Sequence, residues 1–250
     1  MRKLSVFLLC IVLLASCNQN EKPPKQDKTF LILFDVSLSV ANHQIRAAYE
    51  STFRKIFAKV EAGDILLVGY INDKSLNQLE LPVIFYYNSF IPSSDNDMIV
   101  SGEKNHYDST LSCRKDSIYK VVDSILMKVE RKVLYTDIFS SLILAEKLFN
   151  QYPRNKSTLV IFSDMEEDTP QVNFTKENMN DQHSKDILEK QKKDNLLPNL
   201  DGVKVFVIGA TSADYKKREQ IESFWLRYFR ACNADLAKKN YCTVLANFEL

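Results

Sequence analysis

Short apolar runs alternate along the chain with longer stretches in which apolar residues recur every three or four positions. Four of the runs are aliphatic or aromatic enough to be strands that are buried on both faces of a sheet. These runs are residues 30–34, 65–70, 159–162 and 203–208. Such continuous runs are typical of parallel central strands, because helices then cover both faces of the sheet.

The longer stretches predict amphipathic helices, because their apolar positions would form one stripe on a helix surface. They are residues 45–60, 118–129, 138–149 and 221–229. We interpret the stripes as faces that pack against the sheet. The order of strands and helices predicts an α/β fold, with a doubly wound, mostly parallel open sheet and helices on both faces, as in Rossmann-like proteins.

Three further segments complete the predicted fold. Residues 81–88 predict an edge strand, because Pro82 lacks the donor that a central position requires. Residues 89–117 and 169–198 are polar, and we expect both to be loops near one rim of the sheet, the second with a helix at about 183–193. Open sheets of this type bind ligands beyond the carboxyl ends of the strands, where the strand order reverses.

The N-terminus carries the features of an export signal. Arg2 and Lys3 precede an apolar run at residues 4–15, which is shorter than the ~20 residues of a membrane-spanning helix. The run closes with Leu-Ala-Ser-Cys at residues 14–17, which resembles the lipobox of bacterial lipoproteins and implies that Cys17 becomes the acylated first residue. The alternative is an ordinary secretory signal in which this cysteine is incidental.

This reading divides the chain into three parts. Residues 1–16 are a lipoprotein signal peptide, residues 17–28 form a polar, flexible tether, and residues 29–250 form the folded domain. The expected location is the bacterial cell envelope, with the protein attached to a membrane through its lipid on the periplasmic or the surface face.

Net charge separates the classes of partner. The chain has 33 basic and 32 acidic residues, and loss of Arg2 and Lys3 with the signal changes the formal charge from +1 to −1. A nearly neutral domain is not expected to bind nucleic acid, and it has little electrostatic attraction to anionic lipid. The lipid itself would therefore provide the anchoring.

Three cysteines remain in the expected domain. Cys232 and Cys242 flank a short turn and could form a disulfide bond in an exported protein, while Cys113 would be unpaired. Three buried thiols are the alternative, because sequence does not determine connectivity. No cysteine or histidine spacing indicates a zinc site.

Candidate metal ligands follow the first predicted strand. Asp35, Ser37 and Ser39 occupy alternate positions where that strand ends. Carboxylate and hydroxyl oxygens are hard ligands, which suit Mg²⁺ better than zinc or copper. Taken alone, the pattern favours a strand-end aspartate with a serine that caps the next helix over a metal site.

Two further positions join this pattern. Thr136 stands at the start of a predicted helix, and Asp164 follows the strand at 159–162. With these positions, residues 29–248 resemble the von Willebrand factor type A domain and its metal-ion-dependent adhesion site. The resemblance implies that Ser37, Ser39 and Thr136 contact Mg²⁺ (or Mn²⁺ or Ca²⁺), while Asp35 and Asp164 bind the ion directly or through water.

The resemblance implies binding rather than catalysis. In that family the metal captures an Asp or Glu carboxylate of a protein ligand, so we expect a protein partner of this kind and no enzymatic activity. Asp137 would support the metal ligands or stabilise its own helix start. The acidic residues at 166–168 favour a solvated loop before Pro170, and a second cation site or a role in ligand selection is the alternative.

Two other functions use the same strands. An aspartate at the end of the first strand also begins the haloacid-dehalogenase type of site, which would make the protein a Mg²⁺-dependent hydrolase or phosphotransferase. That site requires a second carboxylate two residues later as a proton donor, and Ser37 stands there instead. The third alternative is a metal-free envelope scaffold.

The sequence departs from the type A pattern in one respect. Val36 and Leu38 stand where many type A domains have small spacers, and we expect both side chains to pack in the interior.

The lipobox leads to a prediction about anchoring. Cys17→Ser should leave an unprocessed precursor or release the domain from membranes, because a dozen apolar residues span a bilayer poorly. Membrane fractionation and the electrophoretic mobility of the product would measure this. Unchanged mature size together with unchanged membrane retention would contradict the lipid anchor.

Overall fold

The structure is a computed structural model that describes residues 27–37, 42–72, 80–127, 135–212, 214–245 and 248. The predicted signal peptide, Cys17, Leu38 and Ser39 lie outside the described residues. Within the described ranges, no helix has both the length and the apolar character that a membrane crossing requires.

The described residues form one six-stranded sheet with the order β3-β2-β1-β4-β5-β6. The strands are β1 Lys28–Asp35, β2 Ile65–Ile71, β3 Val83–Tyr86, β4 Lys156–Phe162, β5 Val203–Ile208 and β6 Tyr241–Cys242. All neighbouring strands are parallel except β2 and β3, which pair antiparallel. The predicted α/β class, the mostly parallel sheet and the edge strand are therefore confirmed.

The strand order reverses beside β1. Phe34 near the end of β1 lies opposite Tyr70 of β2 on one side and opposite Phe162 of β4 on the other. The chain leaves β1 toward β2, and later leaves β4 in the other direction toward β5. The carboxyl ends of β1 and β4 thus form the crevice in which sheets of this kind bind ligands.

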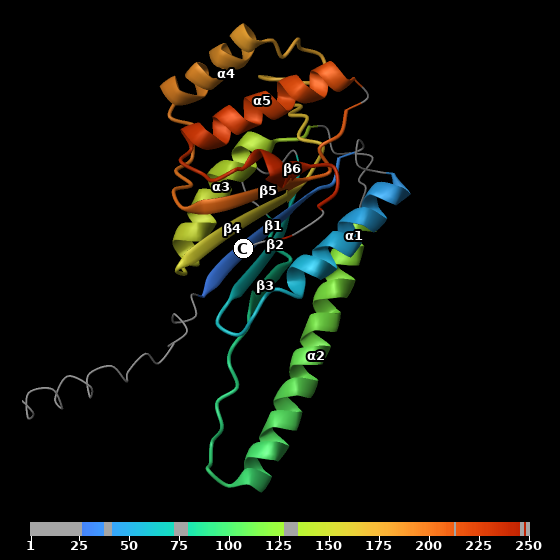
Figure 1. Cartoon of the computed structure of the whole chain (residues 1–250), viewed down its shortest axis with the longest axis vertical. Helices are drawn as coiled ribbons and strands as arrows, with labels where there is room; N and C mark the ends of the chain where they lie inside the picture. Colours follow the sequence, from blue (N-terminus) through green and yellow to red (C-terminus); the bar gives the residue numbers. More distant parts are fainter. Residues whose placement is uncertain are drawn as a thin grey trace, which may run out of the picture.

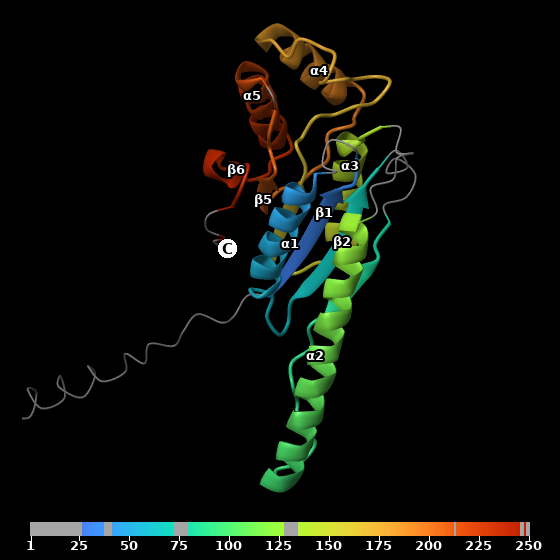
Figure 2. The same cartoon turned by 90° about the vertical axis from the view of Figure 1, so that its right-hand side faces the viewer.

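Helices cover both faces of the sheet (Figures 1 and 2). They are α1 His43–Phe57, α2 Asp97–Met127, α3 Ile138–Gln151, α4 Asp181–Lys193, α5 Tyr215–Ala231 and the short 3₁₀ helix η3 Lys238–Asn240. Alternate side chains of β1 serve two separate cores. Phe30, Ile32 and Phe34 pack with α1 and α2, whereas Leu31 and Leu33 pack with α3 and α5.

The long helix α2 differs from the sequence prediction. The predicted loop at 89–117 is helical from Asp97 onward, and the helix projects beyond the sheet at the bottom of Figure 1. The side chain of Asn96 accepts the backbone N–H of Met98 at 3.0 Å. Within the helix, Lys104 forms an ion pair at 2.8 Å with Asp108, which lies one turn further along. This half of the helix has solvent on most sides, so its sequence carries no apolar stripe that would have revealed it.

The two polar stretches also lie at opposite ends of the molecule rather than near one rim. The start of α2 is at the bottom of both views, whereas α4 is at the top, outside α5 (Figures 1 and 2). The second stretch follows β4 and therefore begins at the carboxyl ends of the strands, while the first follows the antiparallel strand β3 and leaves from the other end. The antiparallel edge strand is the physical reason for the difference.

The predicted disulfide bond is wrong, because all three described cysteines are free thiols. Cys232 ends α5 and is buried in the core on the α3 and α5 face, whereas Cys242 packs against the core on the α1 and α2 face. The sheet separates the two sulfur atoms. The alternative of three buried thiols is wrong as well, because Cys113 is exposed on α2.

The division of α2 into a free half and a packed half can be tested with two matched substitutions. Ile125→Ala removes a side chain that is 3% exposed and should lower the free energy of unfolding by about 2–5 kcal/mol. Ile99→Ala removes one that is 50% exposed and should change it by less than about 0.5 kcal/mol. Chemical denaturation would measure both, and equal effects would contradict the described packing of α2.

Candidate functional site

Asp35 joins the carboxyl ends of two central strands. It is the last residue of β1 and is only 3% exposed. One carboxylate oxygen accepts the backbone N–H of Ser37 at 2.8 Å, and the other accepts the hydroxyl of Ser163 at 2.7 Å. Ser163 directly follows β4, and its own N–H donates to the carbonyl of Ile208 in β5. The carboxylate therefore lies in the crevice where the strand order reverses.

The environment of Asp35 disfavours an isolated negative charge. Burial raises the pKa of its carboxyl group, and the hydrogen bonds from Ser163 and Ser37 offset this only in part. No lysine or arginine among the described residues forms an ion pair with it. The charged form of Asp35 thus has hydrogen bonds but no counter-ion, and a bound cation would supply one.

Asp164 stands one residue beyond the serine that binds Asp35. Its carboxylate accepts the backbone N–H of Glu166 at 3.0 Å, and the side chain is half-buried. Met165 has a φ of 64°, and its N–H donates to the hydroxyl of Ser163 at 2.9 Å. This tight turn keeps Ser163 and Asp164 together at the end of β4. The structure therefore brings Asp35, Ser37 and Asp164 into one region.

Tyr49 of α1 belongs to the same region, although its spacing in the sequence predicts only a core residue. Its ring packs on Phe162 with centroids 5.0 Å apart, and its buried hydroxyl has no hydrogen-bond partner among the described residues. Burial raises the pKa of this phenol well above its usual value, and the charges of Asp35 and Asp164 raise it further. A tyrosine at helical spacing gives no signal in the sequence that its hydroxyl reaches a strand end.

Thr136 is tied to the loop that follows Asp164. Its backbone pairs with that of Asp168 in an isolated antiparallel bridge, with both N–H···O distances at 3.0 Å, and the residue is buried. The next residue, Asp137, accepts the N–H of Ser140 at 2.9 Å and caps α3. Of the two roles expected for Asp137, the structure thus shows the stabilisation of a helix start.

The acidic run after Asp164 is not a solvated loop. Glu166 forms an ion pair with Lys217 of α5 at 3.4 Å, and the backbone of Asp168 forms the bridge to Thr136. Glu167 is completely buried, and one of its oxygens accepts the N–H groups of Ile138 and Phe139 at 2.8 and 3.3 Å. The first turn of α3 therefore holds a carboxylate that sequence patterning assigned to solvent.

Burial also dominates the electrostatics of Glu167. It raises the pKa of the carboxyl group well above the usual value, and the negative charge of Asp137 adds to this effect. The hydrogen bonds from Ile138 and Phe139 act in the opposite direction, and so, more weakly, does the hydroxyl of Thr169. The second carboxylate oxygen of Glu167 is buried and makes no hydrogen bond of ordinary length with the residues that the structure describes.

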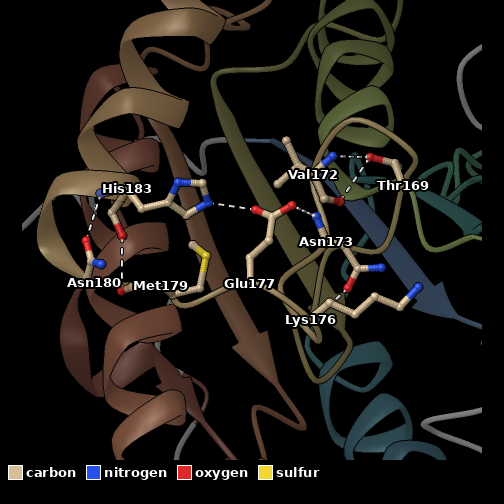
Figure 3. Close-up of polar contacts among 9 residues, drawn as sticks. Thr169, Val172, Asn173, Lys176, Glu177, Met179, Asn180 and His183 are labelled. Atoms are coloured by element: carbon tan, nitrogen blue, oxygen red, sulfur yellow. Dashed lines mark hydrogen bonds and ion pairs between the residues drawn. The ribbon is translucent and has the colours of Figure 1, made fainter.

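The segment from Thr169 to α4 is held by its own hydrogen bonds (Figure 3). Asn173 donates its N–H to the carboxylate of Glu177 at 3.0 Å, and the ring of His183 contacts the same carboxylate at 2.7 Å. Asn180 caps α4 by accepting the N–H of His183 at 2.9 Å. The carboxylate of Glu177 thus links this segment to α4 and helps to fix the loop whose Asp168 pairs with Thr136.

The structure describes only part of the segment that follows β1. Ser39 and Leu38 lie outside the described residues, so the second serine of the pattern has no structural description. Val36 is buried in the core shared with α1, as expected for a spacer that points into packing. The described part of the chain has no group of three or more His, Cys, Asp or Glu side chains that could hold a metal ion.

The predicted ligand set would not form a group of that kind, because it consists of two carboxylates and three hydroxyls. The part that the structure describes around Asp35, Ser37 and Asp164 offers oxygen atoms alone, which is the donor chemistry of Mg²⁺, Mn²⁺ and Ca²⁺. The carboxylate of Asp35 and the buried hydroxyl of Tyr49 both face this region, and among the described residues the first has no counter-ion and the second no hydrogen-bond partner. These residues fit a hard divalent cation.

Comparison of the chain with protein-family models and with curated proteins gives no match. Among solved structures, it is similar to proximal thread matrix protein 1 from the mussel byssus, with 12% identity, a TM-score of 0.44, and coverage of 86% of this chain and 41% of that one. A second structure of the mussel protein, with a zinc-occupied MIDAS motif, has 14% identity, a TM-score of 0.42, and coverage of 79% and 42%.

The human COPII-coat protein Sec24c is similar at 12% identity and a TM-score of 0.37, with coverage of 81% of this chain and 29% of that one. The chain therefore spans less than half the length of these proteins. With scores this low, the fold assignment rests on the strand order described above.

The burial of Glu167 predicts a dependence of stability on pH. Because its pKa is raised in the folded state, the unfolded chain releases this proton first as pH rises above about 4.5, and the free energy of unfolding should fall through that range. The contribution of one such group has a limiting slope of about 1.4 kcal/mol per pH unit. Glu167→Gln should remove it.

Denaturant unfolding at a series of pH values in EDTA would measure this slope. Glu189→Gln, which changes an exposed carboxylate on α4, is the matched control and should keep the wild-type profile. A Glu167→Gln profile parallel to that of the wild type would contradict the buried, proton-binding carboxylate.

Proposed function

We propose that this protein is a lipid-anchored envelope protein whose folded domain binds a protein partner through a divalent cation. Asp35, Ser37 and Asp164 would hold the ion, together with Ser39 and Thr136, which the resemblance to the type A domain adds. Mg²⁺ is the expected ion, and Mn²⁺ or Ca²⁺ would suit the same oxygen ligands. A bound ion with an open coordination position would accept an Asp or Glu side chain from the partner.

The observation that carries the proposal is the position and state of Asp35. Its carboxylate is buried where the strand order reverses, bridges β1 and β4, and lacks a counter-ion among the described residues. A buried charge is costly unless it is paired or coordinates a metal. Asp164 lies beside it and is only half-buried, so the region opens to solvent on the side from which a partner would approach.

The position of the tether supports the same function. β1 begins at Lys28, where the predicted tether ends, and runs to Asp35 at the opposite end of the sheet. Seven residue steps in a strand correspond to about 23 Å. The candidate site would therefore face away from the membrane to which Cys17 would be anchored, and a partner could reach it without displacing lipid.

An enzymatic role has less support at this position. The phosphotransferase alternative requires a general acid two residues after Asp35, and the residue there is Ser37, whose N–H donates to the Asp35 carboxylate. A hydroxyl does not replace a carboxylic acid as a proton donor near neutral pH. The metal-free scaffold differs from our proposal in a measurable way, since it requires no effect of divalent ions.

Paired melting curves test the metal site. Mg²⁺ at about 100 times its dissociation constant should stabilise the wild-type domain by ~2.7 kcal/mol, which for a domain of this size is a shift of roughly 5–10 °C. Asp35→Ala removes the central carboxylate and should abolish the shift. The curves are recorded for each protein in Mg²⁺ and in EDTA by differential scanning calorimetry.

Asp201→Ala is the control, because Asp201 is exposed on the turn that precedes β5, away from the carboxyl ends of the strands. It should keep the full Mg²⁺ shift. A wild-type protein that melts at the same temperature in EDTA and in millimolar Mg²⁺, Mn²⁺ or Ca²⁺ would overturn the proposed site and favour the metal-free scaffold.

A further inference from the structure

Tyr49 offers a polar group to the candidate metal site that the sequence pattern does not contain. The side chain is 2% exposed, and its hydroxyl lacks a hydrogen-bond partner among the described residues. A buried hydroxyl that makes no hydrogen bond loses its hydration without compensation, which destabilises the folded state. Phenylalanine would fill the same space without this cost, so packing alone does not account for the oxygen atom.

The backbone at the end of β5 is shaped to admit this hydroxyl. Gly209 follows β5 with a φ of 100°, and a Cβ atom there would lie 1.9 Å from the Tyr49 oxygen. Any other residue would both strain the backbone and displace the phenol. The N–H of Gly209 donates to the carbonyl of Cys242 at 3.0 Å, which holds the glycine in place.

The same contacts locate the hydroxyl at the rim of the sheet. Gly209 follows Ile208, whose carbonyl accepts the N–H of Ser163, the residue that also binds Asp35. The ring of Tyr49 lies against Phe162, one residue before Ser163. The phenol oxygen is therefore at the ends of β4 and β5, in the electrostatic field of Asp35 and Asp164 but in no direct hydrogen bond with either.

A neutral phenol is a good hydrogen-bond donor and a weak metal ligand. A donor close to two carboxylates, but not bonded to them, suits a water molecule that is shared with a cation. We infer that Tyr49 is a positioning residue of the metal site, which donates its hydroxyl to a water of the bound ion, and that Gly209 is the residue that makes room for it. This inference rests on the proposed function.

Metal binding by Tyr49→Phe tests the inference. The substitution keeps the ring on Phe162 and deletes the oxygen alone. Because loss of a group that orients metal ligands or their waters typically weakens affinity 10–100-fold, the dissociation constant for Mn²⁺ should rise at least about tenfold. Isothermal titration calorimetry with Mn²⁺ as the sole ligand measures it, and the melting temperature in EDTA should stay equal to or rise above that of the wild type.

Tyr228→Phe is the matched control. Tyr228 is also fully buried, but it lies in the core on the other face of the sheet, where its hydroxyl faces the thiol of Cys232. Its Mn²⁺ affinity should equal that of the wild type. A general effect of losing a buried phenol oxygen would change both variants alike and would overturn the inference.

The remaining outcomes separate this inference from the proposed function. If the wild type binds Mn²⁺ and Tyr49→Phe binds it equally well, Tyr49 has no role in the site, while the proposed function stands. If Tyr49→Phe keeps its affinity but melts at a lower temperature in EDTA, the hydroxyl is structural. If the wild type itself binds no Mn²⁺, the proposed function fails, and this inference fails with it.

Discussion

The buried carboxylate of Asp35 is the constraint on which the rest of the site depends. It lies between β1 and β4, accepts hydrogen bonds from Ser37 and Ser163, and has no described counter-ion. A sheet whose strand order reverses at this point leaves an opening beyond the strand ends. The fold thus creates the space, and the charge in that space sets what can occupy it.

A second buried carboxylate on the same rim of the sheet is stabilised in a different way. Glu167 lies at the start of α3 and accepts two backbone N–H groups there, so a helix N-terminus provides part of its stabilisation. Among the described residues no helix start contributes to Asp35, whose carboxylate accepts hydrogen bonds from the hydroxyl of Ser163 and from the backbone N–H and side chain of Ser37. This contrast separates a structural carboxylate, which ties the loop after β4 to α3, from one that is suited to a cation.

The strands were predictable because burial on both faces demands continuous apolar runs, and β5 has the predicted bounds of 203–208. The exposed half of α2 was not predictable, since a helix surrounded by solvent needs no apolar stripe.

The predicted disulfide bond between Cys232 and Cys242 was wrong because proximity in the sequence does not show on which face of a sheet each sulfur lies. The placement of Asp35, Ser37 and Asp164 near the carboxyl ends of β1 and β4 was predictable, because each ends or closely follows an apolar run. The positions of Tyr49 and Glu167 at this site were not predictable, because they depend on tertiary contacts that the order of residues in the sequence does not show.

The central claim is that a divalent cation binds between Asp35, Ser37 and Asp164. Crystals of the protein grown or soaked in millimolar Mn²⁺ test this most directly, because manganese gives an anomalous scattering signal that locates the ion without reference to stability or partner binding. The account predicts an anomalous peak bordered by oxygen atoms of these three residues. A map with no peak at the ends of β1 and β4, from crystals in which that region is free of lattice contacts, would contradict it.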